Sequence, residues 1–326
     1  MRTEHTLCVA FVILVVCATI ACSGSPVRPE QEKPAGGDAV ATPVIAATLV
    51  ASDKSWGNTE GPAVDSKGTL YFTSRGTFKG IAAWSEKEGA RQYLAVATKE
   101  GPGGLWIDDS DNIFLTATGE RKILKVSPDK KVSVVAENFE ANPTLSKGPN
   151  DLVVAKTGTV YFTDPNGYYG DAPNGTIYRI APDGRTSVFS EAITGPNGIA
   201  LSADEKTLYV SHNVSKSTSK IEKWPLNPDG SAGVMSELAT VNNCVADGMA
   251  LDREGDLWLT CYSFGAAYRI APDGRVAGTI TTEQKALTNC IFGRGANNKT
   301  LYLTSSDMER VTGYIYKADL SVPGIR

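Results

Sequence analysis

One position in a phrase that recurs six times along the chain carries the polar residues best suited to chemistry. The phrases are TEGPAVDSKG (59–68), PGGLWIDDSD (102–111), PNDLVVAKTG (149–158), PNGIALSADE (196–205), ADGMALDREG (246–255) and TNCIFGRGAN (288–297). Their second residues are Glu60, Gly103, Asn150, Asn197, Asp247 and Asn289. Five of the six carry a carboxylate or amide oxygen, and such hard donors suit Ca²⁺ and tolerate Mg²⁺ or Mn²⁺. The shared position predicts one divalent-cation site, with Ca²⁺ favoured and Mg²⁺, Mn²⁺ or Zn²⁺ as alternatives.

The same residues also have a simpler structural interpretation. Asn197-Gly198 and Asp247-Gly248 are dipeptides that commonly form turns. Glu60-Gly61-Pro62 is harder to explain in this way, because Glu has no special preference for turns. The shared register of the whole set favours a metal site over turn chemistry alone.

A second recurring phrase predicts the elements that position these residues. The copies are LYFTS (70–74), IFLTA (113–117), VYFTD (160–164), LYVSH (208–212), LWLTC (257–261) and LYLTS (301–305), and they return every 43–49 residues. Their β-branched and aromatic residues alternate with a period of two, which is typical of strands. Strand-rich units repeating at this interval predict an all-β, six-bladed β-propeller over residues 43–326. In such a ring, equivalent positions face one another across the channel mouth.

The last blade runs out of chain before its outer strand. The segment 43–52 (PVIAATLVAS) precedes the first repeat and is itself strand-like. We expect this N-terminal strand to pair into the last blade, which closes the ring and removes an open sheet edge.

The N-terminal residues have the features of an export signal. Arg2 precedes an apolar run, and small residues lead up to Cys22. Residues 19–22 (TIAC) resemble a lipobox, so residues 1–21 are expected to be a lipoprotein-type signal peptide with Cys22 lipidated. Ordinary signal cleavage is the alternative. Residues 22–42 are rich in Pro, Gly and charge and are expected to form a flexible tether. The protein is then exported to the periplasm or cell surface, and it touches the membrane only through its lipid anchor.

The net charge limits the kinds of partner that the protein can bind, and the cysteine content limits the disulfide bonds that it can form. The formal net charge is −4 without basic runs, which argues against a nucleic-acid partner. We expect a monomer that binds a small molecule. Cys244, Cys261 and Cys290 are an odd number, so buried unpaired thiols are favoured, and a Cys244–Cys290 bridge between neighbouring blades is the alternative.

Four segments resemble the SMP-30/gluconolactonase family. They are EGP (60–62), PNDLVV to VYFTDP (149–165), PNGIALS to LYV (196–210) and ADGMALD to DLW (246–258). The resemblance extends over roughly residues 55–318. It implies a six-bladed propeller that binds one divalent cation in its channel and hydrolyses sugar lactones.

The resemblance also implies roles for individual residues. Glu60, Asn197 and Asp247 match the family's metal ligands, and Asp247 matches its candidate base. Asn150 matches a residue that faces the substrate and helps to hold the metal or its water. Asp151 is expected in the site or directly behind it. The chain departs from the family pattern at Thr73-Ser74 and at 211–213 (SHN).

Lactone hydrolysis needs a polarised carbonyl and an attacking water, which a cation and a carboxylate can supply. Asp247 is the expected base, Glu60 the second candidate, and a cation-bound water the alternative nucleophile. His212, the only His after the signal peptide, is expected to contact substrate, with a purely structural role as the alternative. Aromatic residues that could wall a sugar pocket are Phe264, Tyr168 and Tyr169.

Two other functions fit the same sequence. One is a non-catalytic propeller that serves as a binding or scaffold module and holds a structural cation. The other is a propeller esterase or phosphotriesterase acting on an organophosphate or an acyl-homoserine lactone.

Overall fold

The computed structural model describes residues 42–139, 148–167, 169 and 173–325. The chain divides into residues 1–40 and a compact unit, Ala41–Arg326. The predicted signal peptide, the lipidated Cys22 and nearly all of the tether lie outside the described residues, as does Tyr168. No helix in the described part is long and apolar enough to cross a membrane.

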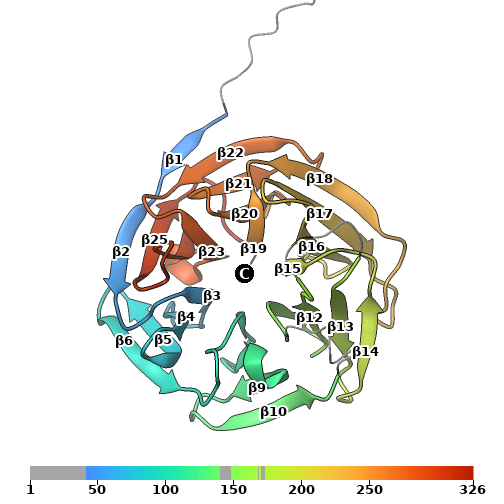
Figure 1. Cartoon of the computed structure of the whole chain (residues 1–326), viewed down its shortest axis with the longest axis horizontal. Coiled ribbons are helices and arrows are strands. Elements are labelled where there is room, and N and C mark those ends of the chain that lie inside the picture. Colours follow the sequence, from blue (N-terminus) through green and yellow to red (C-terminus); the bar gives the residue numbers. More distant parts are fainter. Residues whose placement is uncertain (1–41, 140–147, 168, 170–172, 326) are drawn as a thin grey trace, which may run out of the picture. The chain divides into compact units, whose positions relative to one another are not determined.

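The described residues form an all-β, propeller-like fold in which sheets stand around a central axis (Figure 1). The only helices among them are two 3-10 turns, η1 (Thr118–Glu120) and η2 (Gly295–Asn297). Four sheets have four antiparallel strands each, and a fifth sheet has nine strands.

The first two four-stranded sheets follow each other along the chain. One contains β3 (Thr59–Val64), β4 (Leu70–Arg75), β5 (Lys79–Ser85) and β6 (Gly89–Ala95). The next contains β7 (Leu105–Ile107), β8 (Ile113–Ala117), β9 (Lys122–Val126) and β10 (Val132–Glu137). In each sheet the strands pair in chain order, so every connection is a hairpin.

The next two sheets repeat this order. One contains β11 (Leu152–Val154), β12 (Val160–Asp164), β13 (Thr176–Ile180) and β14 (Thr186–Ser190). The other contains β15 (Pro196–Leu201), β16 (Thr207–Asn213), β17 (Thr218–Pro225) and β18 (Ser236–Asn242). The six repeated LYFTS-type phrases lie in β4, β8, β12, β16, β20 (Leu257–Tyr262) and β24 (Thr300–Ser306), as the alternation predicts.

The nine-stranded sheet stands where the last two blades were expected. One part contains β19 (Val245–Leu251), β20 (Leu257–Tyr262), β21 (Ala266–Ile270), β22 (Val276–Thr281) and β1 (Val44–Ala46). The other contains β23 (Ala286–Phe292), β24 (Thr300–Ser306), β25 (Gly313–Asp319) and β2 (Thr48–Asp53). The two parts are joined where Tyr262 on β20 pairs with Ala286 on β23.

The N-terminal strand closes the sheet as predicted. Strand β2 pairs antiparallel with β25, from Thr48 opposite Lys317 to Asp53 opposite Gly313. The strand just before it, β1, pairs in parallel with β22, and the sequence did not predict this pairing. One short segment therefore covers the outer edges of two neighbouring groups of strands, which protects both from pairing with another chain.

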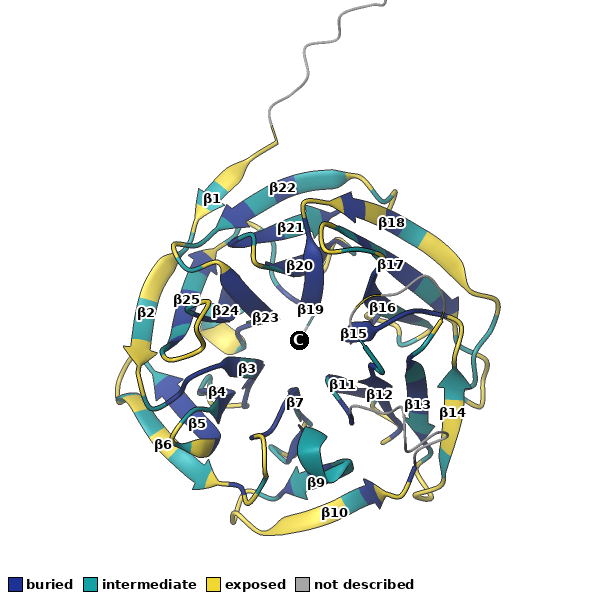
Figure 2. Ribbon diagram, viewed as in Figure 1, coloured by how far each residue is buried: buried dark blue, intermediate teal, exposed yellow. Residues whose placement is uncertain are grey.

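Apolar side chains pack between neighbouring sheets, while the outermost strands face solvent. In Figure 2 the inner strands β3, β19 and β23 are mostly dark blue, the colour of buried residues. The outer strands β6, β10 and β18 are mostly teal and yellow, the colours of partly and fully exposed residues. The contact between the first two sheets includes Ile81, Leu105, Ile107, Leu115 and Val126, all buried. Burial of this kind is the main favourable term in folding, and here it fixes the positions of the inner strands.

The C-terminal segment returns to the channel axis (Figure 1). The backbone N–H of Ile325 donates to the carbonyl of Leu251 (3.3 Å), and that of Gly324 donates to the carbonyl of Asn298 (2.8 Å). Ile325 lines a small apolar cavity together with Leu201 and Leu251, the last residues of two inner strands. This segment therefore lies at the channel end where the inner strands end.

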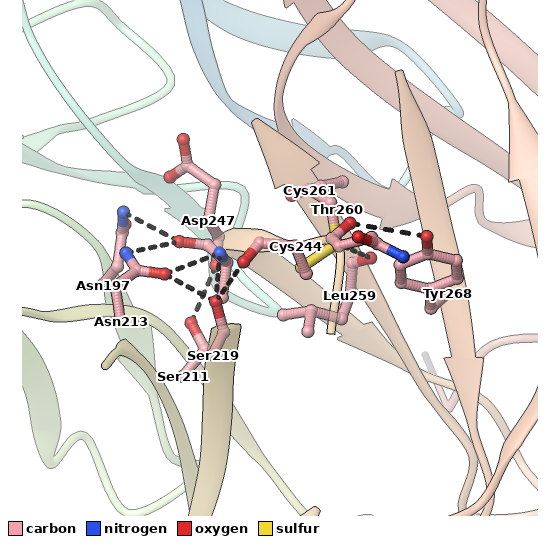
Figure 3. The surroundings of a disulfide bond; sticks show 12 residues. Asn197, Ser211, Asn213, Ser219, Cys244, Asp247, Leu259, Thr260, Cys261 and Tyr268 are labelled. Atoms are coloured by element: carbon pink, nitrogen blue, oxygen red, sulfur yellow. Dashed lines mark hydrogen bonds between the residues drawn. A yellow bond between two sulfur atoms is a disulfide. The ribbon is translucent and has the colours of Figure 1, made fainter. Parts of the chain in front are cut away.

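The cysteine predictions need correction. Cys244 and Cys261 form a disulfide (Figure 3), and Cys290 is a buried free thiol. The prediction of a buried unpaired thiol is right for Cys290 and wrong for Cys244 and Cys261, and the alternative Cys244–Cys290 bridge is wrong. The physical reason is strand pairing: Cys244 directly precedes β19 and Cys261 lies on the adjacent β20, which places their Cα atoms 4.8 Å apart.

Candidate active site

A cavity of about 140 Å³ opens at the channel end where the inner strands begin. The predicted residues Glu60, Asn150, Asn197 and Asp247 all line it. We call this opening the Glu60 mouth. The other lining residues are Asn58, Arg75, Tyr169, Asn213, Val245, Tyr262, Thr288 and Arg310. The register argument thus brought four of the predicted side chains into one cavity.

Local irregularities in the inner strands accompany this arrangement. The ladder register shifts between Glu60 and Ala63 and between Ala246 and Met249. The corresponding strand β15 shifts between Pro196 and Ile199. Such bulges bend a strand and redirect a side chain. The bulged residues include Asn197 and Asp247, and Glu60 is the last paired residue before the bulge in its strand.

The turn interpretation of the Asn-Gly and Asp-Gly pairs is wrong. Both pairs lie inside strands, β15 and β19, rather than in turns. A Cβ on Gly198 would lie 2.2 Å from the carbonyl oxygen of Asp247, and one on Gly248 would lie 1.9 Å from the side chain of Asn289. These glycines are needed because neighbouring inner strands approach too closely for any side chain.

The carboxyl groups in and behind the cavity repel one another. Burial raises the pKa of Asp247 well above its ordinary value, and the charges of Glu60 and Asp151 raise it further. Burial also raises the pKa of Asp151, to about 7. Burial raises the pKa of Glu60, against the opposing effect of the Arg75 guanidinium. A bound cation would relieve this repulsion and favour the charged forms.

Asn197 supplies the sharpest sign of a missing partner. Its side chain is buried, and Oδ1 has no hydrogen-bond partner among the described residues, while Nδ2 donates weakly to the carbonyl of Ala246 (3.4 Å). Leaving a buried acceptor unpaired costs about 1–3 kcal/mol. This oxygen lies in the same cavity as Glu60 and Asp247, so the donor set fits a hard cation.

The carboxylates alone do not make such a site. Among the described residues, no three or more His, Cys, Asp or Glu side chains are grouped so that they could hold a metal ion. Amide oxygens must complete the coordination of any cation, which agrees with a cavity lined by several Asn side chains.

Asn289 and Asp151 lie directly behind the cavity rather than in its lining. Nδ2 of Asn289 donates to Oδ2 of Asp151 (3.1 Å), and the backbone N–H of Leu152 donates to Oδ1 of Asp151 (2.8 Å). Oδ1 of Asn289 accepts from the backbone N–H of Cys290 (2.8 Å). Asn289 therefore supports the site from behind and does not line the cavity.

The neighbouring sheet holds the backbone around Asp247 (Figure 3). Oγ of Ser211 accepts from the N–H of Gly198 (3.0 Å) and donates to the carbonyl of Asp247 (2.9 Å). Oδ1 of Asn213 accepts from the N–H of Ala246 (2.7 Å). These bonds fix the strand next to Asp247, so the departures from the family pattern at 211–213 have a structural role here.

The prediction that His212 contacts substrate needs correction. His212 does not line the Glu60 mouth, and its Nε2 lies 3.4 Å from Oε1 of Glu222, where both side chains are buried. Burial lowers the pKa of His212, and Glu222 opposes that shift. On strand β16 the side chains alternate between faces. His212 therefore points away from the mouth, whereas its neighbours Ser211 and Asn213 hold the backbone around Asp247.

Of the aromatic candidates, one reaches the cavity. Tyr169 lines it, whereas Phe264 packs against the apolar cluster around β19 and β20. Tyr168 lies outside the described residues.

Sequence reasoning missed the residues that come from the ends of the second strands. Arg75 directly follows LYFTS, Asn213 follows LYVSH, and Tyr262 follows LWLTC. The hairpin register was the available signal: Thr59 pairs with Ser74 and Val245 pairs with Tyr262. An antiparallel hairpin returns its second strand to the level at which the first began, so these residues had to reach the mouth.

Similarity to known proteins agrees with this geometry. Residues 58–307 match the SMP-30/Gluconolactonase/LRE-like region. A gluconolactonase of Zymomonas mobilis is 29% identical over 298 residues, which cover 82% of this chain and 80% of that protein.

Two solved structures share the fold. A gluconolactonase of Xanthomonas campestris has a TM-score of 0.67 and 25% identity, covering 83% of this chain and 87% of its own. A calcium-binding protein, regucalcin, from Agrobacterium tumefaciens has a TM-score of 0.69 and 20% identity, covering 86% and 96%. With a family match over most of the described residues, the chain belongs to the SMP-30/gluconolactonase/LRE-like family.

Proposed function

We propose that this protein hydrolyses a small sugar lactone at the Glu60 mouth with the help of one divalent cation. The observation that carries the proposal is the buried Oδ1 of Asn197, which lacks a partner and shares a cavity with two repelling carboxyl groups. The gluconolactonases among its relatives support a lactone as the substrate class.

We infer that the ring has six blades. The two parts of the nine-stranded sheet each contain an inner strand and its successive hairpin partners, as the four separate sheets do. The pair Tyr262–Ala286 then joins two adjacent blades near the channel. This count supports the rotation argument that brought the second residues of the phrases to one mouth.

Glu60, Asn197 and Asp247 would hold the cation, with Asn150 beside them in the cavity. Ca²⁺ is the proposed ion, because carboxylate and amide oxygens are the ligands it prefers. A regucalcin of similar fold is described as a calcium-binding protein. Such an ion, when bound, supplies a Lewis acid that polarises a carbonyl.

Asp247 is the proposed general base. Its carboxyl lines the cavity together with Glu60 and Asn197, where it can accept a proton from a water molecule bound there. It would take a proton from the water that attacks the lactone carbonyl. Glu60 is the second candidate for this role. Asn150 would donate to the lactone and orient it, and Tyr169 would cover it from the rim.

We also propose that the protein is exported and anchored through Cys22. The disulfide Cys244–Cys261 supports this, because such bonds persist mainly in oxidising compartments. The lipid anchor and a monomeric state remain predictions from the sequence.

The experiment is proton release from a panel of aldonolactones by the purified full chain, with added Ca²⁺ and with chelator. We expect turnover above the spontaneous rate that disappears with chelator and in Asp247→Asn. The matched control is Asp109→Asn, an exposed residue near the other end of an inner strand. Cation binding without turnover on any lactone would instead favour a binding module, and turnover that ignores the chelator would overturn the role of the cation.

A further inference from the structure

Arg75 occupies the sector of the Glu60 mouth where the repeated phrase has no side chain. The phrase places Gly103 at the position that holds a polar residue in the other five copies. A Cβ on Gly103 would lie 3.0 Å from Nη2 of Arg75 and 2.4 Å from Oγ1 of Thr116. The glycine therefore leaves the room into which the Arg75 side chain extends.

Neutral groups hold the Arg75 guanidinium in place. Nε donates to the carbonyl of Pro102 (2.9 Å), and Nη2 donates to Oγ1 of Thr118 (3.2 Å). In the described part of the chain, no carboxylate lies within ion-pair distance of Arg75. Its charge is thus positioned in the cavity lining without a direct counter-ion.

A second guanidinium lies at the rim of the same cavity. Arg310 is exposed, lines the cavity, and donates from Nε to the hydroxyl of Tyr262 (3.1 Å), whose ring its guanidinium also covers. Two arginines from different sheets therefore converge on one opening.

Among the described lining residues, the charges leave a positive excess once a divalent ion is bound. Glu60 and Asp247 then balance the ion, while Arg75 keeps its charge. Asp151 does not offset it directly, because its carboxyl is buried behind the cavity and is hydrogen-bonded to Asn289 and to the N–H of Leu152. A planar guanidinium with donors to spare is well suited to a carboxylate.

We propose that the lactone bound at this mouth carries an ionised carboxylate, which Arg75 binds from the wall and Arg310 from the rim. The substrate class is then a lactone of a sugar dicarboxylic acid rather than a neutral aldonolactone. This inference rests on the proposed lactonase function and narrows it.

A matched pair of substrates isolates the charge. D-glucaro-1,4-lactone and D-glucono-1,4-lactone share their ring and hydroxyl groups and differ at C6, which is a carboxylate in the first and a hydroxymethyl in the second. We expect kcat/KM to be at least about tenfold higher for the glucarolactone, as for a hydrogen-bonded charge. We also expect this preference to shrink at high salt, because screening weakens the attraction.

The variant Arg75→Gln should reduce that preference by about tenfold or more, and Arg75→Lys, which keeps the charge, should reduce it less. Arg185→Gln, at an exposed turn, is the control and should leave the preference unchanged. If Arg75→Gln fails to fold, Arg75→Lys and the salt dependence still test the proposal. An equal or higher kcat/KM for the neutral lactone in the unmodified protein would overturn it.

Binding separates this inference from the proposed function. Titration calorimetry with the open-chain products D-glucarate and D-gluconate, in the presence of Ca²⁺, measures the charge preference without any turnover. If neither lactone is hydrolysed but glucarate binds more tightly, the lactonase proposal fails and the anion site remains. If the lactones are hydrolysed and the two products bind equally, the anion site fails and the lactonase proposal remains.

Discussion

Asn289 and Asp151 are hydrogen-bonded to each other across the channel, with 3.1 Å between Nδ2 and Oδ2. One lies on β23 and the other directly precedes β11, and these two strands stand on opposite sides of the ring in Figure 2. The bond lies directly behind the cavity of the Glu60 mouth, whose lining includes neither residue. It therefore ties together two inner strands that share no sheet.

Removing this bond should destabilise the fold. Asn289→Ala leaves a buried carboxyl without one of its donors, and we expect the free energy of unfolding to fall by about 1–3 kcal/mol. Chemical denaturation measures it, and Asn242→Ala, an exposed residue on β18, serves as the control. A double-mutant cycle with Asp151→Asn should show coupling between the two sites. Additive effects would contradict the direct bond.

Ca²⁺ should stabilise the protein through Asn197. A ligand that binds only the folded state adds about 2.7 kcal/mol at a concentration 100 times its Kd, so the Tm should rise as Ca²⁺ is added. In Asn197→Ala the rise should be much smaller at the same concentration, because an oxygen donor is gone. Asn242→Ala should respond like the unmodified protein. Identical Ca²⁺ responses of Asn197→Ala and the unmodified protein would remove Asn197 from the proposed ligand set.

Acid should destabilise the protein through His212. Burial lowers its pKa below the ordinary value of 6.5, so below that pH the unfolded chain binds more protons than the folded one. The free energy of unfolding then falls as the pH drops below 6.5. His212→Gln cannot titrate, so its stability should fall less steeply over the same range. Parallel stability–pH curves for the two proteins would show that His212 contributes nothing to the slope.

The disulfide should stabilise the sheet that carries Asp247. The bond closes a loop with a sequence separation of 17, for which the chain-entropy argument gives about 3 kcal/mol. The double variant Cys244→Ala, Cys261→Ala should therefore have a clearly lower Tm. Reductant should lower the Tm of the unmodified protein towards that value and leave the double variant unchanged. If reductant affects both proteins equally, the loss has another origin, such as the buried Cys290 thiol.

The strands could be predicted from the sequence because their signals are local. Each LYFTS-type phrase shows period-two alternation that depends only on which face of a strand is buried. The four cavity residues followed from the shared register of the phrases, since rotation places equivalent positions at the same height. Asn289 shows where that reasoning ends, because a shared register fixes height but not the direction in which a side chain turns.

Other features depended on contacts between distant segments. Arg75 extends into the mouth beside Gly103, just before β7, where a side chain would crowd its guanidinium. The parallel pairing of β1 with β22 joins residues more than two hundred positions apart, and nothing in either segment encodes the other. The role of His212 was predicted from its chemistry, whereas its contact with Glu222 follows from strand alternation and from the sequence of β17, where Glu222 is two residues from its register partner Lys220.

The position of Ile325 bears on how molecules reach the site. That residue lies where β15 and β19 end and is hydrogen-bonded to Leu251 there, whereas the Glu60 mouth opens where the inner strands begin. We therefore expect substrate to enter and product to leave through the Glu60 mouth itself. On such a route, one product molecule has to be released before the next substrate molecule can bind.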